Sequence, residues 1–182
     1  MIEVQNQQQL GRAMNAVQEF LVHKLLFPKV YLDAEWNGNK VDVLAIDRSG
    51  SGDVHAVHIY PLPPNTTIGA ACILFSSASN LGISLIDEIM SLQSHYRYIA
   101  ITSEDPNARK FNSAELASQW ALAEDGVGRI GILYLDLTED DPKFQVRVIL
   151  RAERFRNSKE IVEMADQFVA SHTANWEYRE EL

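Results

Sequence analysis

Three polar side chains with the chemistry for proton transfer or metal binding fall on two neighbouring segments of strand-like sequence. Residues 40–47 and 53–60 are rich in β-branched and apolar side chains, and a Gly- and Ser-rich separator joins them, which predicts a β-hairpin. If the hairpin is symmetric about its turn, Asp42 lies directly opposite His58. Tyr60, two residues further on, then shares the face of His58. The sequence thus predicts a cluster of a carboxylate, an imidazole and a phenol.

Other acidic residues could complete a metal site around Asp42. Alternation along the preceding strand places Glu35 on the face of Asp33 and Tyr31, from which it could reach Asp42. Glu19 lies about 200° around a helix from Val17 and therefore points away from the apolar stripe. Two interpretations remain: a metal site that uses Asp42 and Glu35 or His58, and a hydrogen bond between Asp42 and His58 within the sheet. The second is the commoner arrangement.

The elements that must position these side chains follow from hydrophobic periodicity. Apolar residues from Leu10 to Leu25 recur at helical spacing, and three short extended segments separated by turn residues predict an antiparallel meander. Later segments predict a helix near residues 84–94, a helix near 112–126, and a final helix from residue 157. The expected strands span residues 30–36, 40–47, 53–60, 96–102, 129–137 and 144–150. This order predicts an α/β fold, a mixed central sheet flanked by helices.

Two segments leave alternatives open. Residues 66–82 contain an apolar run too short for periodicity to separate helix from strand, although a helix is favoured. Cys72 lies in that run, where a buried inert thiol is commoner than a nucleophile. The aromatic and charged tail that begins at Trp176 could dock on the body, dock on a second copy, or fray.

Composition limits the class of protein and its partners. The chain has 182 residues, 46% of them apolar and 23% charged, which predicts one domain spanning residues 1–182 and no membrane partner. Lys and Arg number 16 against 25 Asp and Glu, a net charge of -9 that disfavours non-specific binding of nucleic acid. With one cysteine and no basic-then-apolar N-terminal stretch, we expect a cytoplasmic protein.

One local group of cations departs from this acidic balance. It could contact a specific nucleic acid or an acidic partner, but a solvated outer strand relieved by Glu153 and Glu160 is the simpler interpretation. Its members are Arg147, Arg151, Arg154, Arg156 and Lys159.

From the first helix to the strand at residues 96–102, the chain resembles the restriction-endonuclease-like, or PD-(D/E)XK, nuclease superfamily. Members carry an aspartate early in the second strand, then an acid, one spacer and a lysine on the third. Asp42 matches the first position, whereas His58 and Tyr60 stand where the acid and the lysine would be. The resemblance implies an αβββαβ core, here with extra C-terminal strands and a helix, and a site at Asp42, His58 and Tyr60 that would use Mg²⁺ or Mn²⁺ if active.

The two departures bear directly on that chemistry. A hard dication needs several oxygen ligands, and neutral imidazole and phenol groups are poor ones for Mg²⁺. A tyrosine with an ordinary pKa of about 10 supplies neither the positive charge of lysine nor a ready base at pH 7. We therefore expect a catalytically inactive nuclease-like domain without a cofactor, which acts as a binding or scaffolding module for a protein partner or a second copy.

Two alternatives to the inactive module stay open. One is an active metal-dependent DNA nuclease with a rearranged site that uses Asp42 and Glu35. The other is a regulatory domain that binds a small molecule around His58 and Tyr60, since the same fold supports unrelated functions.

Overall fold

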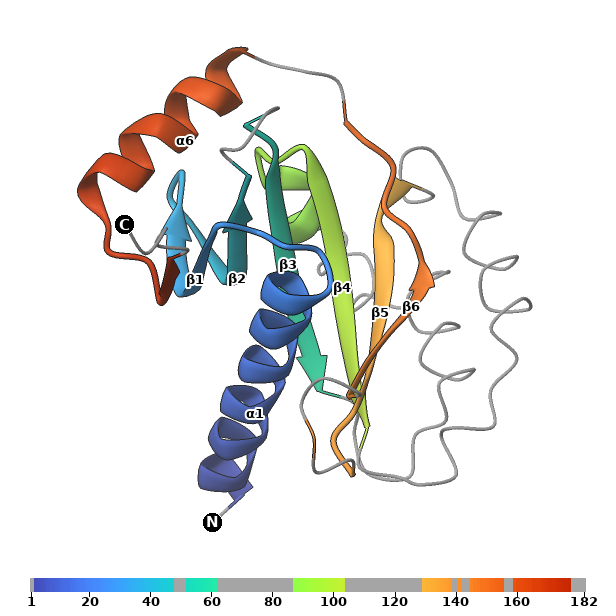
Figure 1. Ribbon diagram of the computed structural model, residues 1–182. Helices are drawn as coiled ribbons and strands as arrows, with labels where there is room; N and C mark the ends of the chain where they lie inside the picture. Colours follow the sequence, from blue (N-terminus) through green and yellow to red (C-terminus); the bar gives the residue numbers. More distant parts are fainter. Residues whose placement is uncertain are drawn as a thin grey trace.

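The computed structural model describes residues 2–47, 52–61, 87–103, 129–138, 141, 145–155 and 159–177. Within them the chain is an α/β protein, with a mixed seven-stranded sheet flanked by helices (Figure 1). The elements, in chain order, are α1 (Ile2–His23), β1 (Lys29–Trp36), β2 (Asn39–Ile46), β3 (Val54–Pro61), β4 (Tyr96–Ser103), β5 (Gly131–Asp136), β6 (Val146–Leu150), α6 (Lys159–Ser171) and β7 (Trp176–Glu177). The expected α/β class is confirmed.

The strands lie in the order β6-β5-β4-β3-β2-β1-β7. Strands β1, β2 and β3 form the predicted antiparallel meander, β4 and β5 run parallel to β3, and β6 is antiparallel to β5. Asn37 and Gly38 both have positive φ, 50° and 74°, so they close the first hairpin in the two-residue turn that matches strand twist. The second hairpin has the predicted symmetric register, with Val43 opposite Val57 and Ile46 opposite Val54.

Helices α1 and α6 pack on opposite faces of the sheet. Val43 and Val57 lie in a cluster with the apolar stripe of α1, which includes Val17 and Leu21. Leu44 and Ala56, their neighbours along the strands, lie in a second cluster with Ile161, Ala165 and Phe168 of α6. Successive side chains of a strand point to opposite faces, so the central strands must be apolar on both sides.

The alternation of faces shifts by one residue near the middle of the first hairpin. Tyr31 and Ala34, three residues apart, both lie in the cluster beneath α6, and so do Val41 and Leu44 on the partner strand. Between them, Asp33 has φ 51° and is missing from an otherwise continuous β1–β2 pairing. The left-handed residue therefore rotates the tip of the hairpin, which carries Trp36 onto Phe168, with ring centroids 5.4 Å apart.

The segment that begins at Trp176 docks on the body, one of the outcomes left open by the sequence. Val30 pairs with Trp176 in the short strand β7, and the Leu32 amide donates a hydrogen bond of 2.7 Å to the Asn175 side chain. Strand β7 thus extends the sheet beyond β1.

Several predicted boundaries need adjustment. The helix expected to run to residue 94 ends at Ser91 within the described segment 87–91, and the strand expected from residue 144 begins at Val146. Residues 66–82, with Cys72, and the helix expected near 112–126 fall outside the described residues. Among the helices that the structure describes, none is both long and apolar enough to cross a membrane.

Gly131, at the start of β5, is required by close packing. A Cβ atom there would collide with the Tyr98 ring and lie 2.6 Å from the Ala152 backbone nitrogen. We expect Gly131→Ala to lower the free energy of unfolding in urea by about 2 kcal/mol, because ring and backbone must both shift. As a control, Gly11→Ala on the exposed side of α1 meets no atom within 4 Å and should raise stability by about 0.5–1 kcal/mol. Equal effects in the two variants would contradict this account.

Candidate functional site

The Asp42 carboxylate lies where strands β2 and β3 stop pairing. Backbone pairing between them ends at Val43 and Val57, and one residue further on the Asp42 carboxylate takes over. Its Oδ2 accepts a 2.7 Å hydrogen bond from the Ile59 amide and lies 3.3 Å from His58 Nδ1. A buried amide must be satisfied, so the carboxylate replaces the backbone carbonyl that a continued ladder would have supplied.

The structure thus brings Asp42 and His58 together as the hairpin register predicts. The side chains are largely shielded, with exposed fractions of 11% for Asp42 and 21% for His58. Tyr60 is half-buried two residues beyond His58 and so lies on the same face of β3. Its cross-strand neighbour on β4 is the buried, apolar Ile101, which in turn pairs with Tyr134 of β5.

The prediction that Glu35 shares a face with Tyr31 is wrong. The rotation at Asp33 places Ala34 and Trp36, instead of Glu35, on the side of Tyr31, and Glu35 is exposed. Simple alternation fails here because a residue with positive φ turns the chain by one step within the strand. Glu35 therefore points away from the side to which Tyr31 belongs.

The other acidic candidates are engaged elsewhere on the surface. Asp33 lies 2.9 Å from the Lys40 ammonium and raises the pKa of that lysine, and Glu19 pairs with His23 one turn later on α1 at 3.1 Å. Among the described residues, no group of three or more His, Cys, Asp or Glu side chains is arranged to hold a metal ion. Within the described residues, Asp42 therefore has the His58 imidazole beside it, and no second carboxylate joins the pair to form a metal site.

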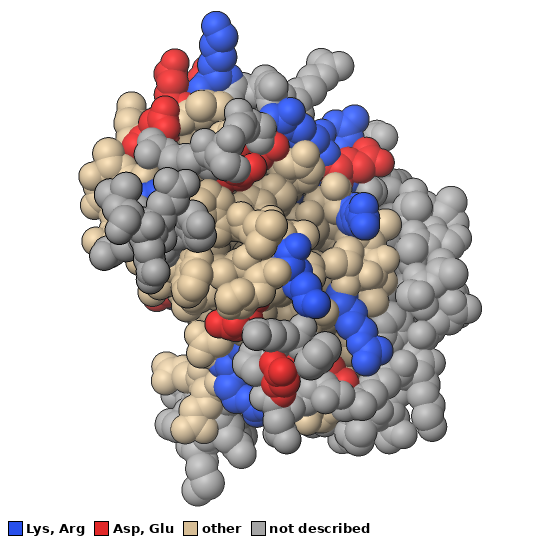
Figure 2. Space-filling model, in the orientation of Figure 1, with Lys and Arg blue, Asp and Glu red and all other residues tan. Residues whose placement is uncertain are grey.

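The cation group divides into paired and solvated members. Arg154 pairs with Asp53, whereas Arg147 and Arg151 are exposed. Figure 2 shows the face of the molecule that is turned to the viewer in Figure 1. Lys and Arg side chains gather there over β4 to β6, and acidic side chains lie among them near the upper edge. Arg156 lies outside the described residues. This mixture fits a solvated outer strand.

Sequence reasoning missed a second polar group, at the amino ends of the parallel strands. His95, fully buried before β4, lies 3.8 Å from Asp53, which precedes β3. His55 on β3 stacks on Tyr96 with centroids 4.3 Å apart and meets the edge of Phe27 at 4.5 Å. The available signal was the position of both histidines within two residues of a strand start. Their proximity depends on the parallel pairing of β3 with β4.

Burial controls the charge of His55. Removal from water lowers its pKa from 6.5 to about 4, and the attraction of Asp53 and Asp47 offsets this only in part. His55 is therefore neutral at pH 7 and packs as an aromatic ring between Tyr96 and Phe27.

Comparisons with known proteins add little to this geometry. No protein-family model matches the chain, and no curated protein matches it. A solved structure, the SPO1766 protein of unknown function from Silicibacter pomeroyi, is 13% identical, with 91% of this chain and 84% of that chain covered and a TM-score of 0.49. We draw no argument about function from a likeness at this level.

Substitution of Asp42 separates its role as an acceptor from its charge. We expect Asp42→Ala to lower the free energy of unfolding by about 2–3 kcal/mol, because the buried Ile59 amide loses its partner. Asp42→Asn keeps an oxygen acceptor and should cost about half as much. Urea denaturation at pH 7.5 measures both. If Asn were as damaging as Ala, the charge rather than the acceptor would be the important property.

The neutral, largely desolvated His55 predicts acid sensitivity. Its folded pKa lies below the unfolded value, so the unfolded chain binds more protons between pH 6.5 and about 4, and stability falls as pH is lowered through that window. The loss should approach about 3 kcal/mol from this group. Between pH 7 and pH 4.5, His55→Phe should lose about 2–2.5 kcal/mol less than the wild type in urea denaturation, while the exposed His172→Asn should follow the wild type. Parallel curves for His55→Phe and wild type would refute the assignment.

Proposed function

We propose that this protein is a binding or scaffolding module built on a nuclease-like fold, in which the Asp42 position serves the structure of the sheet instead of catalysis. The described order of α1, β1, β2, β3, the helical residues 87–91 and β4 supports the comparison with a nuclease-like core, since the sequence resemblance implies an αβββαβ order. The meander and the parallel β4 belong to that order too.

The observation that carries the proposal is the engagement of Asp42 Oδ2. A backbone amide and an imidazole nitrogen both lie against this oxygen, so a metal ion would have to displace a buried hydrogen bond to use it. Cleavage of a phosphodiester through a hard dication needs several carboxylate or carbonyl oxygens around the ion. His58 and Tyr60 offer an imidazole nitrogen and a phenol at the positions where the resemblance would place an acid and a lysine.

A domain without a metal site could still bind a partner through its surface. The partner that fits best is a protein or a second copy of this chain, because the net charge of -9 opposes extended contact with a polyanion. A protein partner whose surface carries both positive and negative charges would not be repelled in this way.

Metal titration and a cleavage assay test the proposal together. Calorimetry with MgCl₂ and with MnCl₂ should give no saturable binding in the millimolar range, and supercoiled and single-stranded DNA should stay intact in the presence of either ion. The result that overturns the proposal is cleavage by the wild type that Asp42→Asn abolishes, which would support a metal-dependent nuclease.

A companion measurement separates the third class of function. A regulatory domain that binds a small molecule through His58 and Tyr60 should give saturable thermal shifts in a screen of metabolites, and His58→Gln should remove the shift. The scaffolding proposal expects His58→Gln to change the melting temperature without altering any such response. Sedimentation velocity over a hundredfold range of concentration then reports whether the partner is a second copy.

A further inference from the structure

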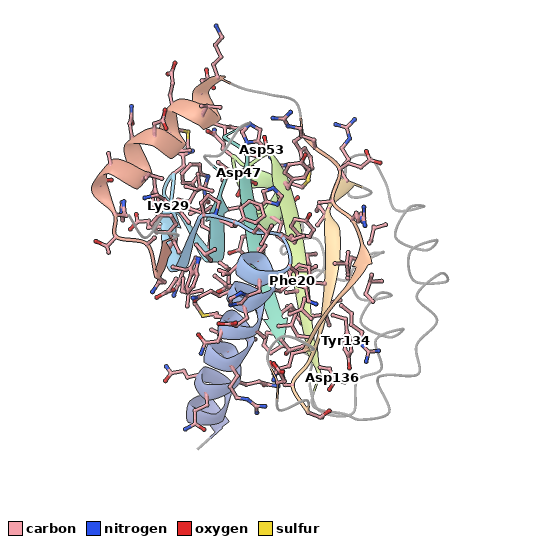
Figure 3. All side chains as sticks on the ribbon, in the orientation of Figure 1. Phe20, Lys29, Asp47, Asp53, Tyr134 and Asp136 are labelled. Carbon is pink, nitrogen blue, oxygen red and sulfur yellow. The ribbon has the colours of Figure 1, made fainter. Side chains whose placement is uncertain are left out.

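A short segment fastens the amino ends of the three parallel strands. Residues 151–155, here called the strap, follow β6 and run past the starts of β5, β4 and β3 (Figure 1). The strap amide of Glu153 donates to the Arg129 carbonyl and that of Phe155 to the His95 carbonyl, both at 2.9 Å. Arg154 reaches further and pairs with Asp53, which lies just ahead of β3 (Figure 3).

Side-chain packing adds to these backbone contacts. The Arg97 guanidinium lies over the Phe155 ring, 3.8 Å from its centroid, and desolvation there lowers the pKa of this arginine. Gly131 has no Cβ, which lets the Ala152 backbone pass close to β5. The strap therefore touches each parallel strand at or just before its first residue.

His95 occupies the centre of this arrangement and is fully buried. Its ring Nδ1 accepts a 3.0 Å hydrogen bond from the Val54 amide, while its own amide donates to the Val54 carbonyl at 2.9 Å. Because Nδ1 is an acceptor, the ring proton must be on Nε2. That nitrogen is buried without a hydrogen-bond partner, an arrangement that costs about 1–3 kcal/mol and is relieved if water reaches it.

Three titratable or charged groups face His95 from the elements around it. Asp53 lies 3.8 Å from Nδ1 and is also the partner of Arg154, and His55 approaches from β3. Burial is the main cause that lowers the pKa of His95, the Asp53 charge raises it, and the Arg154 charge lowers it. The neutral ring thus belongs to the closed arrangement.

We propose that the strap is an acid-released latch with His95 as its trigger. A proton added at Nδ1 would remove the acceptor of the Val54 amide and turn the ring into a donor and a cation. The new cation would compete with Arg154 for the Asp53 carboxylate, which loosens the side-chain contact of the strap at its far end. The released segment would expose Phe155 and Arg97 at the amino ends of β3, β4 and β5.

The direction follows from linkage between protonation and opening. The closed form disfavours charge on His95, whereas a hydrated ring in the open form titrates near the ordinary value of about 6.5. Proton uptake therefore favours the open form, and the strap should be closed at pH 7.5 and open increasingly as the pH falls below about 6.5.

Amide hydrogen exchange of the full chain, followed by NMR, tests the latch. Protection factors correct for the intrinsic effect of pH on exchange, and Ala100 in the central strand reports global unfolding. Between pH 7.5 and pH 5.5, we expect protection of the Glu153 and Phe155 amides to fall several-fold relative to Ala100, with about tenfold as the limit that uptake of one proton at an open-form pKa of about 6.5 allows. His95→Asn places an oxygen acceptor near the position of Nδ1 but cannot take up a proton, so its strap should stay protected at pH 5.5.

Two histidine variants serve as controls for His95→Asn. His172→Asn and His55→Phe should open as the wild type does, which separates the trigger from an exposed histidine and from the neighbouring partly buried one. Unchanged protection in the wild type at pH 5.5, or equal opening in His95→Asn, would overturn the proposal. If His95→Asn does not fold, the carbon-bound ring protons of His95 in the wild type give the answer: the latch requires their titration midpoint to coincide with the loss of strap protection, and separate midpoints refute it.

Discussion

The geometry of this protein depends on one buried amide, that of Ile59, which needs an acceptor at the point where two strands separate. The Asp42 carboxylate satisfies it and so allows the β2–β3 ladder to stop while β3 continues. Freed from β3, the tip of the first hairpin can rotate at Asp33 and carry Trp36 under α6, where it meets Phe168. A nuclease would use a carboxylate at this position to bind a metal ion. Here the Asp42 carboxylate instead helps Trp36 to pack between the sheet and α6.

The two ends of the parallel strands differ in what their polar groups contact. Away from the amino end of β3, Asp42 contacts His58 and the backbone amide of Ile59. At the amino ends, His95 and Asp53 contact a segment more than fifty residues away in sequence. Changes at the first end should act on the local twist of the sheet, whereas changes at the second act on how the C-terminal third of the chain is attached.

Sequence reasoning succeeds where one local rule fixes geometry and fails where two rules compete. A Gly-rich symmetric turn fixes hairpin register, so the approach of Asp42 to His58 could be predicted without a structure. The face of Glu35 cannot be predicted in this way, because alternation breaks at Asp33, a residue type that tolerates positive φ but does not require it. The environment of His95 could not be foreseen, because it needs Val54, Asp53 and the strap to converge from three parts of the chain.

The amino-acid sequence by itself determined the α/β class, the antiparallel meander and the pairing of one carboxylate with one imidazole, since these follow from periodicity and turn composition over short distances. Only the tertiary structure decided what that carboxylate does, which face Glu35 occupies and which histidines are neutral. The physical reason is that hydrogen-bond satisfaction and desolvation depend on every element that surrounds a group, and those neighbours are distant in sequence.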